Sequence, residues 1–175
     1  MIIKSMSRKS KRFDQIVRYL LRTQATEQSW YITQHLDADF NDVDSVIKEF
    51  ESNAELKKAR MGGVYAYHEI ISLHPRDKIL AEQPWILYEI ALEYLRRRSP
   101  NAKVLAVNHL DRDHHHCHLL ISSNVVDSSK VIRISKAEFR IIKLEMERYI
   151  QREFPQLQYS RRVERELNYS QELNV

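Results

Sequence analysis

The chain has 175 residues, of which 43% are hydrophobic and 30% are charged, and these proportions are typical of a single folded domain. Its two glycines, Gly62 and Gly63, are adjacent, so the glycine-rich loops that cradle phosphates in nucleotide-binding proteins are excluded. The single cysteine, Cys117, excludes a disulfide framework and a zinc site built from several thiolates, and it suits a reducing cytoplasm.

The charge balance favours a polyanionic partner. Lysine and arginine number 28 against 24 acidic residues, which gives a net charge of +4, and the basic residues crowd the first 22 positions. No apolar stretch approaches the length of a membrane span, and the N-terminus lacks the apolar region of a signal peptide. We therefore expect a cytoplasmic protein with no membrane insertion.

The first half of the chain is predicted to contain both strands and helices. In chain order these are a strand at 2–6, a helix from Ser7 or Ser10 to about 23, a helix at 41–58 and a strand at 64–73. The first helix has the clearest pattern, because its apolar residues recur at i, i+3, i+4, i+7 and i+8 from Phe13 to Leu21. Residues 24–40 show no decisive pattern.

The second half is predicted to contain a helix at 84–98, strands at 103–110 and 116–123, a candidate edge strand at 131–134 and a helix from Ser135 to about 154. Ser135 and Glu138 have the spacing of a capping box. The polar segment between the two central strands predicts an antiparallel hairpin. We therefore expect an α+β domain over residues 1–155, with helices packed on a central antiparallel sheet, and a polar tail at 156–175.

Histidines are concentrated in one segment: five of the eight lie between His109 and His118. Residues i and i+2 of a strand face the same side, so His116 and His118 project together while Cys117 turns away. His109 ends the preceding strand of the hairpin, and pairing of the two strands would bring three imidazoles together in an arrangement that can bind a catalytic metal. The alternative is a histidine-rich surface loop that binds metal adventitiously.

The loop inside the predicted hairpin carries further polar residues. Asp111 and Asp113 are placed to accept the second ring N–H of a ligand histidine, which would fix the orientation of that ring. His114 and His115 are more typical of bystanders or DNA contacts than of ligands.

The histidine segment resembles the third motif of conjugative relaxases, the mobilisation nucleases of the HUH endonuclease superfamily. In this chain the motif reads His109-x-Asp111-x₄-His116-Cys117-His118.

Two more motifs of that family occur in the expected order. A basic, serine-rich start at 4–10 precedes a helix that carries Tyr19, and a middle motif at 68–73 carries Ser72 at the end of a predicted strand. On the helical wheel, Tyr19 lies roughly 130° from the centre of the apolar stripe, which argues against a simple core role for this tyrosine.

The resemblance implies a reaction and a set of residues. It implies sequence-specific nicking of single-stranded DNA at an origin of transfer by transesterification, with a 5′-phosphotyrosine intermediate, in plasmid mobilisation or conjugation. The implied cofactor is manganese or magnesium held by His109, His116 and His118, although three imidazoles favour manganese, zinc or a later metal over magnesium. The implied catalytic residues are Tyr19, Asp111 and Ser72, and the DNA contacts are Arg8, Lys9, Lys11, Arg12 and Arg112. The implied partners are single-stranded origin DNA, accessory mobilisation proteins and a coupling protein.

Two alternatives to this function stay open. The first is a Rep-like or transposase-like HUH nuclease that uses Tyr149, on the helix after the histidine motif. The second is a non-catalytic DNA-binding relative, or a metal-binding module that regulates transfer. Four aromatic residues could stack on DNA bases, although such residues are more often part of the core: Trp30, Tyr31, Tyr65 and Tyr67.

Overall fold

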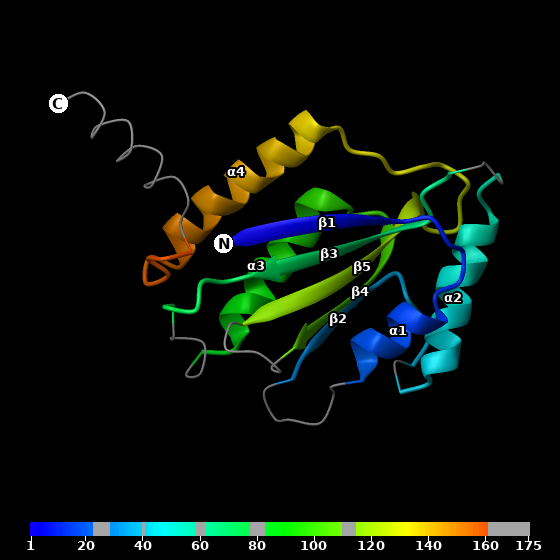
Figure 1. Ribbon diagram of the computed structural model, residues 1–175, viewed down its shortest axis with the longest axis horizontal. Helices are drawn as coiled ribbons and strands as arrows, with labels where there is room; N and C mark the ends of the chain where they lie inside the picture. Colours follow the sequence, from blue (N-terminus) through cyan, green and yellow to red (C-terminus); the bar gives the residue numbers. More distant parts are fainter. Residues whose placement is uncertain (23–28, 40, 59–61, 78–82, 110–114, 161–175) are drawn as a thin grey trace.

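The computed structural model describes residues 1–22, 29–39, 41–58, 62–77, 83–109 and 115–160 (Figure 1). Within these residues the chain forms an α+β domain built on one five-stranded antiparallel sheet with strand order β1-β3-β5-β4-β2. The strands are β1 (Ile2–Arg8), β2 (Tyr31–Gln34), β3 (Ala66–Ser72), β4 (Ala102–His109) and β5 (His116–Val125). The helices are α1 (Asp14–Leu21), α2 (Val43–Glu55), α3 (Trp85–Arg98) and α4 (Lys136–Glu153).

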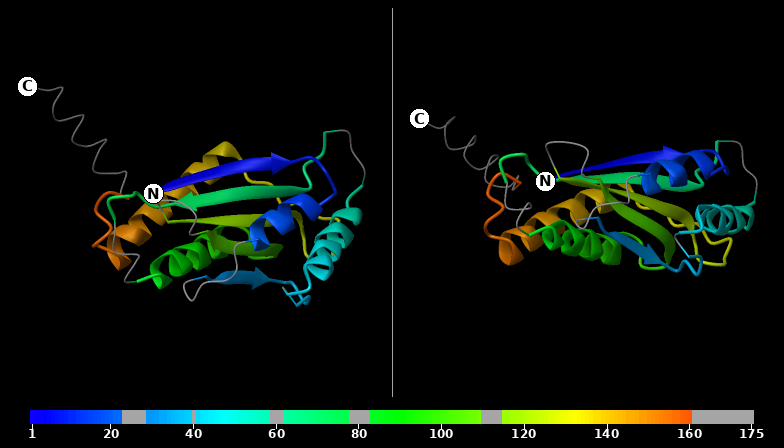
Figure 2. Two further views of the ribbon diagram at one scale, coloured as in Figure 1. Left: turned by 60° about the horizontal axis from the view of Figure 1, so that its bottom comes forward. Right: turned by 90° about the horizontal axis from the view of Figure 1, so that it is seen from below.

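The predicted central hairpin is confirmed as β4 and β5, which pair antiparallel and set His109 opposite His116. All eight residues of β4 and all but the last residue of β5 are buried. Their nearly continuous apolar sequences follow from this position, because helices cover both faces of the sheet (Figures 1 and 2).

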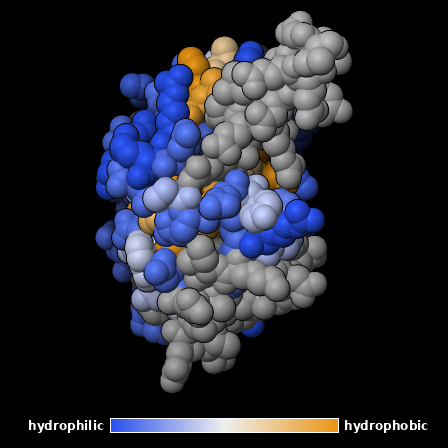
Figure 3. Space-filling model, turned by 90° about the vertical axis from the view of Figure 1, so that its left-hand side faces the viewer, coloured by the Kyte–Doolittle hydropathy of each residue, from blue (hydrophilic) through white to orange (hydrophobic). Residues whose placement is uncertain are grey.

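The side-chain alternation of β5 divides the core into two clusters. Cys117, Leu119 and Ile121 pack on the face covered by α3 and α4. Leu120 faces the other way and joins the cluster that α1 and α2 cover, where the rings of Phe13 and Phe50 lie 5.5 Å apart. The side that lies at the left of Figure 1 is mostly hydrophilic over its described atoms (Figure 3), as expected when the apolar residues fill these two clusters.

The predicted start of the first helix at Ser7 or Ser10 is wrong. β1 pairs with β3 in unbroken register from Ile2 to Arg8, so these backbone groups bond within the sheet instead of opening a helix. The hydroxyl of Ser10 accepts a hydrogen bond from the backbone N–H of Arg12 in the following turn, and α1 begins at Asp14.

Two short segments also differ from expectation. The undecided region 24–40 contains β2, an edge strand of four residues that pairs with β4. The candidate edge strand at 131–134 is wrong, because within it only Val131 forms a bridge, to Asn124. The chain reaches that bridge through a turn in which Asp127 has a φ of 52°, and a single bridge does not build a strand.

The C-terminal helix and residues 154–160 pack closely on the domain. Ser135 and Glu138 form the predicted capping box at the start of α4. After α4, Leu157 is fully buried, and the hydroxyl of Ser160 donates to the buried carboxylate of Asp77 at 2.5 Å. None of the helices in the described ranges is both long enough and apolar enough to cross a membrane.

Candidate active site

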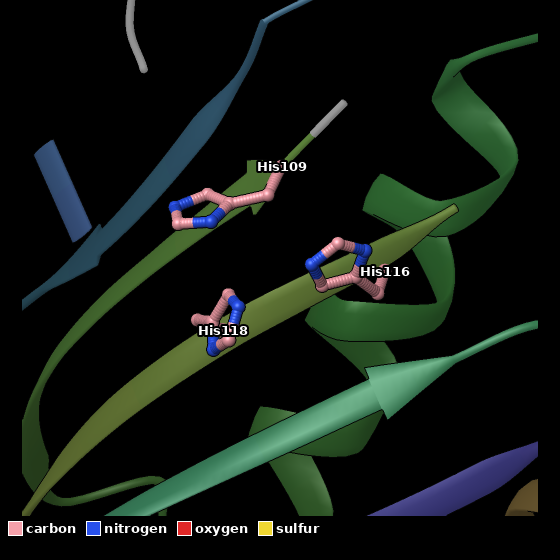
Figure 4. Close-up of side chains that lie close together, drawn as sticks. All are labelled: His109, His116 and His118. Atoms are coloured by element: carbon pink, nitrogen blue, oxygen red, sulfur yellow. The ribbon is translucent and has the colours of Figure 1, made fainter. Parts of the chain in front are cut away.

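Three histidines meet where β4 ends and β5 begins. His109, His116 and His118 are buried, and each offers a ring nitrogen that lies within 4.8 Å of the other two (Figure 4). The antiparallel register produces this grouping, because it sets His109 opposite His116 and turns all three rings toward the α1 side of the sheet. The predicted convergence of these imidazoles is confirmed.

The orientation of His109 is fixed by the backbone of α1. Its Nε2 lies 3.1 Å from the carbonyl oxygen of Leu20. A carbonyl oxygen only accepts, so the proton of His109 is on Nε2 and its Nδ1 carries the lone pair. His109 therefore has the tautomer that a ligand bound through Nδ1 requires.

His118 is oriented by another histidine, His68 of β3. Nδ1 of His118 and Nε2 of His68 lie 2.9 Å apart, and the two rings stack with centroids 5.1 Å apart. Burial, followed by the positive charge of Arg8 and electrostatic repulsion from the neighbouring His109 ring, lowers the pKa of His68 to about 4, so this imidazole is neutral at neutral pH. A neutral His68 can accept a hydrogen bond from Nδ1–H of His118. This leaves Nε2 of His118 as the ring nitrogen that can bind a metal.

Tyr19 of α1 completes the arrangement. Its hydroxyl lies 3.5 Å from Nε2 of His118, and its ring centroid lies 5.4 Å from those of both His109 and His118. Helix geometry explains this position, because Ile16, Val17 and Leu20 bury the apolar face of α1 and leave Tyr19 half-buried beside that face. The guanidinium of Arg22 lies over the Tyr19 ring, 4.3 Å from its centroid.

A pocket of about 330 Å³ opens in front of these groups. Its lining residues come from β1, α1, β3 and β5: Ile2, Lys4, Tyr19, His68, Ile70, Ser72, His116 and His118. Ser72 therefore lies at the site, where β3 pairs it with His116. Its hydroxyl lies 3.5 Å from the carbonyl oxygen of Leu73, and this weak local contact is its only hydrogen bond within the described ranges.

Tyr149 is not part of this pocket. It lies on α4 and packs against the cluster on the opposite face of the sheet, with its ring centroid 5.9 Å from that of Phe154. Burial, together with the carboxylates of Glu89 and Glu93, raises the pKa of Tyr149. Position and electrostatics therefore both disfavour Tyr149 as a nucleophile acting beside the histidines.

The predicted DNA contacts differ in where they lie. Arg8 lies at the end of β1 on the same face as Lys4, while Lys9 and Arg12 are exposed just after it. Lys11 forms an exposed ion pair with Glu55 at 2.7 Å. Asp111 and Arg112, together with Asp113 and His114, lie outside the described residues.

Sequence reasoning missed His68, which had no assigned role. The same alternation rule that grouped His116 with His118 would have found it, because His68, Ile70 and Ser72 share one face of β3. The missing information was the strand order: only the sheet shows that β3 lies next to β5, with Ile70 opposite His118.

The donor set fits a divalent cation. Catalytic metal sites are commonly held by three protein ligands, and three buried imidazoles meet here. Two of these rings are oriented by hydrogen bonds, His109 by the carbonyl of Leu20 and His118 by His68. The pocket in front of His116 and His118 leaves room for substrate oxygens. His109, His116 and His118 could therefore hold a metal ion that keeps open coordination positions.

Comparison with known proteins agrees with this site. A family model for relaxases, described as the MobA/VirD2-like nuclease domain, matches residues 19–153, which include Tyr19, Ser72 and the histidine triad. A search of curated proteins finds no significant match. Because the matched region covers more than half of the chain, this protein belongs to the relaxase family, and its domain is that of a DNA-nicking enzyme.

Proposed function

We propose that the protein nicks one DNA strand at an origin of transfer, in a sequence-specific way, during plasmid mobilisation or conjugation. Tyr19 is the nucleophile of this reaction. The observation that carries the proposal is the position of the Tyr19 hydroxyl, 3.5 Å from Nε2 of His118, in a pocket that Tyr19 lines together with His116 and His118.

The proposed reaction is a transesterification. The Tyr19 oxygen attacks the scissile phosphorus, the bond from phosphorus to the 3′ oxygen breaks, and the products are a 5′-phosphotyrosine and a free 3′ hydroxyl. One phosphodiester replaces another, so the same site can rejoin the strand. A phenol is mostly protonated at neutral pH, and the Arg22 guanidinium places positive charge beside the ring whose oxygen becomes negative during the attack.

The proposed cofactor is manganese or magnesium, held by His109, His116 and His118. A divalent cation bound there supplies polarisation of the scissile phosphate and neutralises the charge that its non-bridging oxygens gain. Three nitrogen donors favour manganese over magnesium on ligand softness.

The remaining roles follow from position and charge. Ser72 hydrogen-bonds the scissile phosphate or an adjacent base, and Asp111 supports a ligand histidine. The single strand runs over the basic segment that contains Arg8, Lys9, Lys11 and Arg12, with a further contact from Arg112. The protein acts in the cytoplasm with accessory mobilisation proteins and a coupling protein.

The test compares two tyrosines. Wild-type protein, Tyr19→Phe and Tyr149→Phe are incubated with manganese and single-stranded DNA from the origin of transfer of the element that encodes the protein, and covalent adducts are resolved on a denaturing gel. We expect Tyr149→Phe to form the adduct as wild type does and Tyr19→Phe to form none. Adduct loss in Tyr149→Phe alone would overturn the assignment of Tyr19. Absence of cleavage by wild type with manganese and with magnesium would leave a DNA-binding relative without turnover.

A further inference from the structure

A second cavity, here called the distal cavity, lies at the opposite end of β3 from the catalytic pocket. It measures about 410 Å³, and the residues that matter for its chemistry are Lys57, Lys58, Tyr65, Tyr67 and Arg133. Ser72 at the far end of β3 lines the catalytic pocket, whereas Tyr67 near the start of β3 lines the distal cavity. Five residues separate them along β3, which corresponds to about 17 Å, and the side chain of Tyr67 points to the opposite face of the sheet from that of Ser72.

The distal cavity is positively charged. Three cationic side chains line it, and no carboxylate is among its described lining residues. Burial, with the adjacent charge of Arg133, lowers the pKa of Lys57. Neighbouring cationic side chains repel one another when no carboxylate lies among them, so an anionic ligand that binds between them is favoured.

The three cations differ in how they are held. The Lys57 ammonium donates to the Val64 carbonyl and, at 2.7 Å, to the Ser123 hydroxyl, and it lies 5.0 Å from the centroid of the Tyr65 ring. Lys58 and Arg133 are exposed and take part in no ion pair within the described ranges. Lys57 therefore shapes the wall, while Lys58 and Arg133 are available to a ligand.

Basic residues connect the distal cavity to the catalytic pocket. Lys4 lines the catalytic pocket, and Arg8 lies four residues further along β1 on the same face. Nε of Arg8 is buried and has no hydrogen-bond partner among the described residues. Lys11 follows, with its ammonium 5.5 Å from the centroid of the Tyr65 ring at the distal cavity.

The spacing of the two cavities suits a nucleic acid strand. A separation of about 17 Å along β3 requires at least about five nucleotides at the stacked spacing of about 3.4 Å per nucleotide, because the strand also has to pass the edge of the sheet. Phosphates bound by lysine and arginine, with bases packed on aromatic rings, are typical of single-strand binding. Lys58 and Arg133 provide the cationic surface, and the half-buried Tyr67 provides the aromatic one, while Tyr65 is buried in the cavity wall.

We propose that the distal cavity binds a flanking segment of the single DNA strand whose scissile phosphate occupies the catalytic pocket, with Lys58 and Arg133 on a phosphate and Tyr67 against the adjoining nucleoside. The strand runs between the two cavities past Lys4 and Arg8. This inference rests on the proposed function, because the bound strand is the substrate of that reaction.

Strand length provides the test. Fluorescein-labelled thymidine trinucleotide and dodecanucleotide are titrated with protein in EDTA over a series of salt concentrations, and binding is followed by anisotropy. The trinucleotide is too short to occupy both cavities, so wild type should bind the dodecanucleotide much more tightly. In the double variant Lys58→Ala/Arg133→Ala this gain should fall about tenfold, and the slope of log affinity against log salt should fall by about 1.4, at about 0.7 for each lost contact.

The matched control is Arg140→Ala/Arg148→Ala, which removes the same charge from exposed positions of α4. The control should keep the gain, as should the charge-preserving double variant Lys58→Arg/Arg133→Lys. An unchanged gain in Lys58→Ala/Arg133→Ala overturns the proposal, and so does an equal loss in the control. If the cavity serves a free anion, inorganic phosphate will raise the melting temperature of wild type but not of the double alanine variant, while the dodecanucleotide gain stays the same in both. The assay contains no metal and scores no cleavage, so failure of the nicking reaction leaves its outcome unaffected.

Discussion

At the residue scale, the site depends on hydrogen bonds that orient the rings. Leu20 fixes His109 through its carbonyl oxygen, and His68 fixes His118 at 2.9 Å. Neither partner is a metal ligand, yet each decides which ring nitrogen has its lone pair available. Such partners commonly change metal affinity or activity by about 10–100-fold when removed.

The first prediction concerns His68. His68→Ala should weaken manganese binding about 10–100-fold, because His118 loses the acceptor that holds its ring and tautomer. His68→Gln should recover part of the affinity, since its amide oxygen can accept the same hydrogen bond. Manganese binding is measured by electron paramagnetic resonance, and the DNA adduct is measured in a single turnover.

The control for this prediction is His74→Ala. His74 stacks on Tyr159 at 5.6 Å between ring centroids and does not line the catalytic pocket, so its loss should leave manganese binding unchanged. If His68→Ala and His74→Ala bind manganese equally well, the orienting role of His68 is refuted.

At the element scale, a buried ion pair joins β3 to α3 beneath the site. Glu69 and Arg98 lie 3.1 Å apart with side-chain exposures of 0% and 1%, and the Tyr94 hydroxyl donates to the same carboxylate at 2.5 Å. Ser5 of β1 also donates to Glu69 at 2.8 Å. Glu69 thus connects three elements, and it follows His68 directly in β3.

The arginine cluster at 96–98 is explained by the same network. Arg98 pairs inward with Glu69, while Arg96 and Arg97 pair with Glu93 on the outer side of α3. The basic charge of this cluster is therefore used in ion pairs within the domain, unlike that of Lys58 and Arg133.

The second prediction tests the buried pair. Glu69→Gln should lower the free energy of unfolding by about 3–5 kcal/mol, because the buried Arg98 guanidinium stays charged but loses the carboxylate that pairs with it. Urea denaturation followed by circular dichroism measures the change. Glu55→Gln, which breaks the exposed pair with Lys11, should cost less than about 1 kcal/mol. Similar losses in the two variants would contradict the role of burial.

At the scale of the whole molecule, the catalytic pocket draws residues from distant parts of the chain. Tyr19 comes from α1, His68 and Ser72 from β3, and His118 from β5. These elements approach one another only in the folded domain, so a ligand that binds several of them stabilises the folded state over the unfolded chain.

The third prediction applies the same linkage to the metal, whose candidate ligands His109, His116 and His118 come from β4 and β5. Manganese at 100 times its dissociation constant should stabilise the domain by about 2.7 kcal/mol, which raises the melting temperature by about 5–10 °C for a chain of this size. Differential scanning fluorimetry with and without manganese measures the shift. The shift should disappear in His116→Ala. A shift of the same size in that variant would place the binding of manganese elsewhere.

The sequence predicted the parts of the site that depend on local spacing. The alternation of His116 and His118 and the polar loop after His109 were enough to predict the hairpin and the histidine triad. The wheel position of Tyr19 showed that this residue lies outside the centre of its apolar stripe. The pairing of distant segments was harder to predict. β2, which pairs with β4 at the edge of the sheet, has only four residues, and its sequence shows no clear alternation of apolar and polar residues.

What the sequence determined by itself is the chemistry that is available: three imidazoles on one hairpin, a tyrosine off the core stripe and a basic start. Only the tertiary structure decided which of these groups act together. Strand order placed β3 beside β5, which brought His68 to His118, and the packing of α1 on the sheet brought Tyr19 to the triad while Tyr149 stayed on the opposite face. The physical reason is that alternation and helical period fix the face of each element locally, whereas neighbours in a sheet are chosen by burial across the whole domain.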